Sequence, residues 1–153
     1  MRIATVVPAL VAAFAVAGCA HPSGPSPSGG TYTSQVDRYL ARQADQERGQ
    51  GFTRWVAGPV HGRLNNGASS SHQMDVISGN QYVVFGQCDN DCTDLDLKLW
   101  DPDGSLIMQD VAVDDHPTLV FAPKTTGRLR IEVIMAHCNV NPCYYGVELM
   151  ARP

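Results

Sequence analysis

The sequence predicts an all-β domain, an antiparallel β-sandwich of jelly-roll-like organisation preceded by one short amphipathic helix. Two observations predict the sandwich. After residue 52 apolar and polar residues alternate over short runs, and turn-forming residues recur about every ten positions. A third observation, apolar residues at helical spacing before residue 49, predicts the helix. The 153-residue chain has room for one such domain after a leader and a linker.

Residues 1–18 are predicted to be a lipoprotein signal peptide. Arg2 supplies a positive charge, and the apolar run over 3–17 is too short to span a bilayer as a helix. The run closes with Val-Ala-Gly-Cys at 16–19, which resembles the lipobox of bacterial lipoproteins. In such proteins the cysteine is lipidated and the peptide is cut just before it, so the resemblance implies a lipid on Cys19. The alternative is a plain secretory signal that leaves Cys19 free.

Lipidation at Cys19 would place the protein in the cell envelope, anchored to a membrane by acyl chains. Each buried methylene of such a chain contributes about 0.8 kcal/mol. Ala20 is not the Asp that resembles an inner-membrane retention signal, so we expect the outer rather than the inner membrane. Residues 19–31 form the predicted stalk, because they are rich in Pro, Ser and Gly and lack apolar periodicity. An extended stalk of this length reaches about 30 Å.

Residues 32–51 are predicted to form the helix. Ser34 is expected to cap its start, and glycines at 49 and 51 to end it. One helical face carries the apolar residues Val36, Tyr39, Leu40 and Ala44. We expect this narrow stripe to pack on the sheet within the domain, rather than to bind a partner.

Residues 52–153 are predicted to form the sandwich. The clearest strands are expected at 82–85, 95–99, 106–108, 118–122, 129–135 and 145–150, with weaker ones at 60–64 and 73–77. The last strand places Tyr145, Val147 and Leu149 on one side. The Asn-Asn-Gly sequence at 65–67 predicts a hairpin turn, and Asp-Pro-Asp-Gly at 101–104 predicts another.

The order of these motifs over 60–150 resembles the pre-peptidase C-terminal (PPC-like) β-sandwich. The motifs are Gly-Asn-Gln-Tyr at 79–82, the alternating run at 94–99, the turn at 101–104, Asp115, and Thr-Gly at 126–127 before a strand. PPC-like domains are usually non-catalytic modules appended to secreted bacterial peptidases, so the resemblance implies an accessory role. Here no peptidase domain precedes the module, and the cysteines depart from the family pattern. We therefore expect any accessory role to be exerted in trans.

The four cysteines of the domain are predicted to form two disulfides, as expected of an even set in an oxidising compartment. Cys88 and Cys92 lie in one loop and Cys138 and Cys143 in another, each loop inferred to close a hairpin. Chain entropy favours the long-range pairings. Sequence neighbours meet early in folding, however, so we predict the local pairs. Zinc or redox chemistry would favour Cys-x-x-Cys spacing, which is absent.

Acidic residues around the first cysteine pair are candidate calcium ligands, since carboxylates are hard oxygen ligands. They are Asp89, Asp91, Asp94 and Asp96. The alternative is that they form turns, bonding to their own backbone and keeping the loop soluble. No other cofactor is predicted.

Charge and motif content narrow the function. The net charge is −4 and the basic residues form no stripe, which disfavours nucleic acid binding. The serines at 69–71 lack a Gly-x-Ser-x-Gly context, and His116 next to Asp115 in sequence does not make a catalytic pair. We expect a non-catalytic envelope module that binds a protein, glycan or ion through loops or a sheet face, such as an aromatic face with Trp55 or Trp100. The alternatives are a small secreted hydrolase with an unrecognised site and an inhibitor of an enzyme that attacks the envelope.

Replacing the predicted lipidation site tests the anchor. Cys19→Ala should leave the precursor unprocessed and unlipidated, because the resemblance places both acylation and cleavage at this thiol. Mass spectrometry of the N-terminus of the wild-type and variant proteins measures both steps. A mature wild-type protein with an unmodified Cys19 would contradict the lipoprotein prediction.

Overall fold

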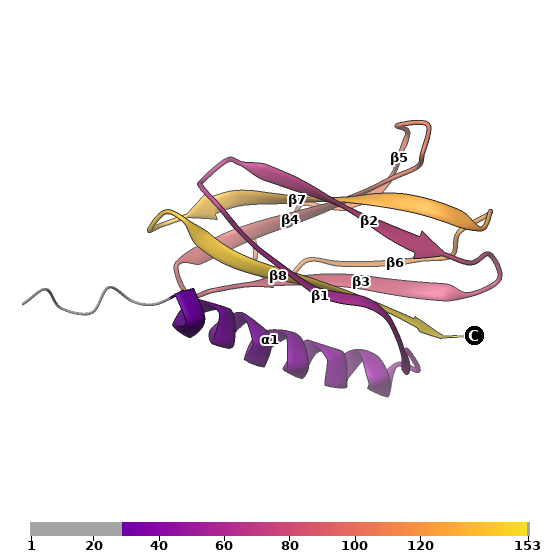
Figure 1. The fold of residues 1–153 in the computed structure, drawn as a ribbon, viewed down its shortest axis with the longest axis horizontal. Coiled ribbons are helices and arrows are strands. Elements are labelled where there is room, and N and C mark those ends of the chain that lie inside the picture. Colours follow the sequence, from indigo (N-terminus) through magenta and orange to yellow (C-terminus); the bar gives the residue numbers. More distant parts are fainter. Residues whose placement is uncertain (1–28, 153) are drawn as a thin grey trace, which may run out of the picture.

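The computed structural model describes residues 29–152, which form one helix and eight strands (Figure 1). The predicted signal peptide, Cys19 and most of the stalk lie outside the described residues. The elements are α1 (Gly29–Gly49), β1 (Arg54–Leu64), β2 (Ser69–Val76), β3 (Gln81–Cys88), β4 (Cys92–Trp100), β5 (Leu106–Asp110), β6 (Thr118–Phe121), β7 (Gly127–Cys138) and β8 (Cys143–Arg152). Within residues 29–152 no helix has the length and apolar character needed to cross a membrane.

The strands form two four-stranded antiparallel sheets that pack face to face. Sheet A has the order β1-β8-β3-β6, and sheet B has the order β2-β7-β4-β5. Alternate residues of each strand point into the core between the sheets, among them Leu95, Leu97 and Leu99 of β4 and Tyr145, Val147 and Leu149 of β8. The predicted antiparallel sandwich is confirmed, as is the side on which the last strand is buried.

Three loops predicted as hairpin turns instead connect the two sheets. The Asn-Asn-Gly turn joins β1 of sheet A to β2 of sheet B, the Cys88–Cys92 loop joins β3 to β4, and the Cys138–Cys143 loop joins β7 to β8. The hairpin predictions were wrong at these places because turn residues signal a chain reversal but not the strand's hydrogen-bonding partner. The turn at 101–104 does close a hairpin, since β4 pairs with β5.

Helix α1 covers the outer face of sheet A, where it lies along β8 and β3 (Figure 1). Its buried residues Val36, Leu40 and Ala44 pack with Val83, Phe85 and Met150 of the sheet. Gly146 permits the close approach, because a Cβ atom there would lie 2.6 Å from Leu40 Cδ1 and 2.9 Å from Val36 Cγ1. The apolar stripe of the helix thus packs within the domain, as expected.

The helix begins earlier than its sequence suggests. It takes in residues 29–31, which were assigned to the stalk, and Ser34 is not its cap: Ser34 Oγ donates a hydrogen bond to the Thr31 carbonyl from within the helix. The stacked rings of Tyr32 and Tyr144, 5.2 Å apart, hold the first turn against β8. This tertiary contact stabilises the first turn of the helix, whose own sequence shows no apolar periodicity. The end near Gly49 agrees with the prediction, and Gly51 takes a positive φ of 95°.

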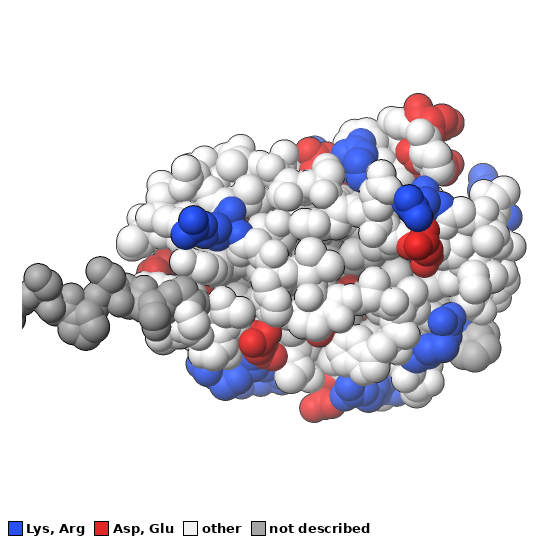
Figure 2. Space-filling view, viewed as in Figure 1, with Lys and Arg blue, Asp and Glu red and all other residues white. Residues whose placement is uncertain are grey.

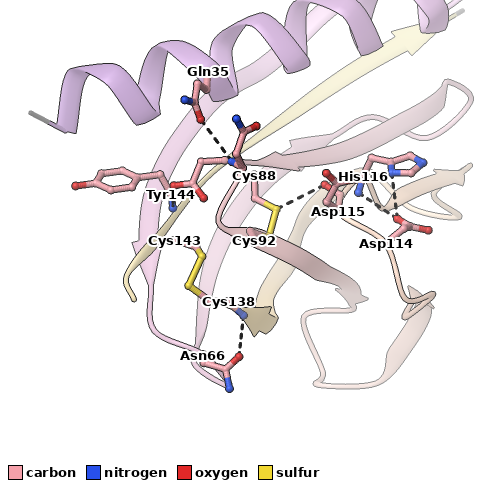
Figure 3. The surroundings of a disulfide bond; sticks show 12 residues. Gln35, Asn66, Cys88, Cys92, Asp114, Asp115, His116, Cys138, Cys143 and Tyr144 are labelled. Atoms are coloured by element: carbon pink, nitrogen blue, oxygen red, sulfur yellow. Dashed lines mark hydrogen bonds and ion pairs between the residues drawn. A yellow bond between two sulfur atoms is a disulfide. The ribbon is translucent and has the colours of Figure 1, made fainter. Parts of the chain in front are cut away.

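Both predicted disulfides are formed, and each joins cysteines whose Cα atoms are 5.9 Å apart (Figure 3). The loops that carry them adjoin. Asn139 N–H donates to the Asp91 carbonyl at 2.8 Å, and Cys138 N–H donates to Asn66 Oδ1 at 2.8 Å. All three loops between the sheets at this end are therefore tied together, and we call them the arch end of the sandwich.

Removing one disulfide should loosen its own arch and leave the domain folded. The Cys88→Ala/Cys92→Ala variant should lose about 2 kcal/mol of unfolding free energy, the chain-entropy value for so short a ring. Hydrogen exchange followed by mass spectrometry should show faster exchange at the first arch and unchanged protection in β8. The Cys138→Ala/Cys143→Ala variant is the matched comparison, with the effect centred on the other arch. Loss of the cooperative unfolding transition in either variant would contradict a local role.

Candidate functional site

Two hollows of about 350 Å³ each open on the described surface. One lies between α1 and the loop that joins β5 to β6. The other lies beside the start of β5 and the turn between β6 and β7. Neither was foreseen from the sequence, because each is lined by segments that are distant along the chain.

The first hollow, here called the Gln87 groove, is formed by three elements. Its lining residues are Tyr39, Arg42, Gln43 and Gln46 of α1, Gln87 of β3, and Asp115 and His116 of the β5–β6 loop. Strand β6 pairs with β3 only over residues 82–85, so the flank of β3 beyond Phe85 is bordered by the loop instead. Gly86 N–H donates to the Pro117 carbonyl at 3.0 Å, which holds the loop in place.

His116 is the titratable group of this groove that sequence reasoning singled out. Its Nδ1 lies 2.9 Å from Asp115 Oδ1 and 3.5 Å from Asp114 Oδ1 (Figure 3). The hydrogen bond with Asp115 is the main cause that raises the pKa of His116, which favours the imidazolium form. The lining residues include no Ser, Thr or Cys, and the serines at 69–71 lie on β2 of the other sheet. The structure therefore places no serine or cysteine beside His116 in this groove.

The second feature is a group of exposed apolar side chains on β5, on β6 and in the loop between them. We call it the β5–β6 edge, and its residues are Leu106, Ile107, Val111, Val113 and Val120. Val113 is 87% exposed. The second hollow borders this edge and is lined in part by Phe121 and Leu129 of the core. The sequence signal for this surface is the pair of valines at 111 and 113, which are apolar residues in a loop that also contains Asp114 and Asp115.

Carboxylates cluster beside the β5–β6 edge. Burial and then the neighbouring Asp114 raise the pKa of Asp94. Burial raises the pKa of Asp96 in the same direction, with further contributions from Asp94, Asp110 and Asp114. These shifts arise because like charges on β4, β5 and the following loop lie close enough to repel one another. The edge is therefore both apolar and acidic.

The four candidate calcium ligands do not converge. Asp89 is only 1% exposed, and its Oδ2 accepts a hydrogen bond from Tyr144 N–H at 2.9 Å, which ties the two disulfide-bonded arches together. Asp94 and Asp96 lie on strand β4. Within residues 29–152 no three His, Cys, Asp or Glu side chains form a group that could hold a metal ion. The geometry thus gives the calcium hypothesis no support, and Asp89 acts as a structural acceptor.

The two tryptophans do not share one face of the sandwich. Trp55 lies on β1 of sheet A and Trp100 on β4 of sheet B, and each is covered by an arginine, Arg48 and Arg130 respectively. Trp100 also donates its indole N–H to Glu132 at 3.0 Å. On the face shown in Figure 2 the basic side chains are dispersed, several beside acidic ones.

Glu148 is a buried carboxyl group that sequence reasoning missed. It lies on the helix-covered face of β8, is 5% exposed, and its Oε2 has no hydrogen-bond partner among residues 29–152. Burial raises the pKa of Glu148 to about 7, opposed by Arg48 and assisted by Asp37. Side chains alternate between the two faces of β8, which puts Glu148 on the outer face of the sheet. Glu148 is buried because helix α1 covers that face.

Comparison with known proteins adds little. No family model matches the chain, and no curated protein matches it. Among solved structures, the fold is similar to the crystal structure of Aeromonas hydrophila PliG, a periplasmic lysozyme inhibitor of g-type lysozyme. The TM-score is 0.49 at 9% sequence identity, over 64% of this chain and 88% of that chain. A likeness this distant does not indicate a shared function.

Neutralising Glu148 should stabilise the protein above pH 7. Because the folded pKa is raised, the wild-type protein loses stability as the pH rises from about 4.5 through 7, by up to about 3 kcal/mol. Glu148→Gln should remove this decline, so the variant gains on the wild type between pH 5 and pH 8 in denaturant unfolding. Glu132→Gln, on the opposite sheet, is the control and should keep the wild-type pH profile. If the unfolding free energy of Glu148→Gln varied with pH as that of the wild type does, the raised pKa of Glu148 would be refuted.

Proposed function

We propose that the protein is a lipid-anchored, non-catalytic module of the cell envelope that binds a protein partner along the β5–β6 edge. The observation that carries this proposal is the concentration of exposed apolar side chains on that edge. The anchor rests on the lipobox-like sequence ending at Cys19. The resemblance to non-catalytic PPC-like modules is consistent with an accessory role of this kind.

The apolar side chains are gathered rather than scattered. Five of the eight large apolar residues that are exposed among residues 29–152 belong to the β5–β6 edge. The other three, Trp55, Ile77 and Val140, lie on different elements. Single exposed apolar residues need no explanation, whereas several on neighbouring elements favour a surface that a partner covers.

The backbone of β5 offers a way to bind. β5 is the last strand of sheet B and pairs only with β4, so its other side is unpaired within the sheet. Edge strands are commonly protected by Lys or Pro. β6 is flanked by Pro117 and Pro123, whereas β5 contains neither residue type. An extended segment of a partner could therefore add to β5 as a further strand, with a side chain placed in the adjoining hollow.

Charge indicates the chemistry of that segment. Asp94, Asp96, Asp110 and Asp114 lie beside the apolar residues and repel one another in the free protein. A segment that combines apolar with Lys or Arg side chains would relieve this repulsion and cover the edge at the same time. We therefore infer a partner with a basic, apolar, extended segment.

The position of the start of β5, one end of this edge, suits a tethered protein. α1 begins at the arch end, and the tip of the β4–β5 hairpin lies at the opposite end (Figure 1). Contacts of Tyr39 and Gln35 with Asn90 hold the first arch against α1. A chain anchored ahead of α1 would thus present the start of β5 away from the membrane.

Site-specific cross-linking in the envelope tests this proposal. A photoreactive residue at position 113 should yield one dominant protein adduct in living cells, whereas the same residue at position 140, in the Cys138–Cys143 loop, should not. The partner is then identified from the adduct and purified. Absence of an adduct at position 113, or equal adducts at both positions, contradicts the proposed surface.

Binding of the purified partner supplies the quantitative test. Ile107→Asp and Val113→Asp should each weaken binding at least about ten-fold, because a carboxylate is added to an apolar and already acidic surface. Val140→Asp is the matched control and should bind as the wild type does. Raising the salt concentration from 50 to 500 mM should also weaken wild-type binding. Unchanged affinity of both edge variants would refute the proposal.

A further inference from the structure

We propose that the Gln87 groove is a second binding site and that its ligand is a small anionic saccharide, a sugar ring that bears a carboxylate. This inference rests on the polar lining of the groove and not on the apolar β5–β6 edge. Three separate elements, α1, β3 and the β5–β6 loop, converge to form it.

Gln87 is the first indication that the groove is built for a ligand. It is only 9% exposed, lies on the face of β3 that otherwise carries Val83 and Phe85, and its side chain has no hydrogen-bond partner within the described protein. The amide of Gln87 can donate and accept hydrogen bonds towards the groove. The groove that it lines is the place from which such partners can come.

Two cationic groups flank this amide. Arg42 forms no ion pair within residues 29–152, and its guanidinium lies 5.9 Å from the centre of the Tyr39 ring. His116, across the groove, is hydrogen-bonded to Asp115 and favours its protonated form. A guanidinium and an imidazolium that face one hollow can make charge-assisted hydrogen bonds to a single carboxylate.

The remaining lining residues suit hydroxyl groups. The amides of Gln46 and Gln87 each donate and accept, and Asp115 accepts, which matches sugar hydroxyls that do both. Asp115 and Asp114 lie 2.9 and 3.5 Å from His116 Nδ1 and offset its charge, so the groove suits a single carboxylate rather than a polyphosphate. A volume of about 350 Å³ is at the lower end of ligand pockets and fits one sugar ring.

Binding of glucuronate to the full-length protein tests the proposal, with glucose and acetate as comparison probes. Side-chain amide resonances of glutamine in two-dimensional NMR report the site directly. Glucuronate should shift the Gln87 amide resonance saturably at millimolar concentration. Glucose should bind about ten-fold more weakly because it lacks the carboxylate, and acetate should bind more weakly still because it lacks the ring.

Variants separate the roles of the residues. Arg42→Gln should weaken glucuronate binding about ten-fold and bring it close to that of glucose, while Arg42→Lys should retain part of the preference. Gln87→Leu should weaken both sugars. Arg63→Gln, on β1 and outside the groove, is the control and should bind as the wild type does. Melting temperatures near that of the wild type establish that each variant is folded.

Four results would overturn the inference. They are no shift of the Gln87 resonance with glucuronate, equal affinity for glucose and glucuronate, equal affinity for acetate and glucuronate, and unchanged glucuronate binding by Arg42→Gln. The second would remove the anionic character of the ligand and the third its saccharide character. None of them depends on whether a protein binds at the β5–β6 edge.

Discussion

Strand β8 is covered on both faces and paired on both sides, and the rest of the domain is arranged around this constraint. It lies between β1 and β3 in sheet A, with its inner residues in the core of the sandwich and its outer residues beneath α1. A strand in this position must be apolar or small on both faces. Gly146 meets that requirement towards the helix, whereas Glu148 violates it and becomes a carboxyl group whose pKa is raised by burial.

The arch end depends on the same strand. β8 begins at Cys143, next to Tyr144, which exchanges backbone and side-chain hydrogen bonds with Asp89 of the first arch. Asp89 Oδ2 is thereby paired with the Tyr144 N–H, whereas Asp89 Oδ1 is buried with no partner among the described residues. One end of the sandwich is therefore fixed by two disulfides and by hydrogen bonds between loops, and the Gln87 groove adjoins this end, since Gln87 directly precedes Cys88.

Residue pattern predicted the elements better than their connections. Alternation of apolar and polar residues identified the strands because each strand buries one face, as Leu95, Leu97 and Leu99 show. The short spacing of Cys88 and Cys92 predicted the disulfide that the structure contains. The same alternation cannot state which sheet a strand joins, so the arches were taken for hairpins. The burial of Glu148 and Gln87 could not be predicted from the alternation either, because a helix and a loop that are distant in sequence cover these residues.

Both candidate surfaces emerge where the helical cover of sheet A ends. α1 packs on β8, β3 and β1, and the side towards β6 is closed by the loop over 111–117 instead. This loop carries Val113 towards the β5–β6 edge and Asp115 and His116 in the Gln87 groove. It is also held at two points, since Leu95 N–H donates to the Asp114 carbonyl and Gly86 N–H donates to the Pro117 carbonyl. A loop fixed in this way loses little conformational freedom when a ligand binds, so the interactions that it makes are not offset by a large ordering entropy.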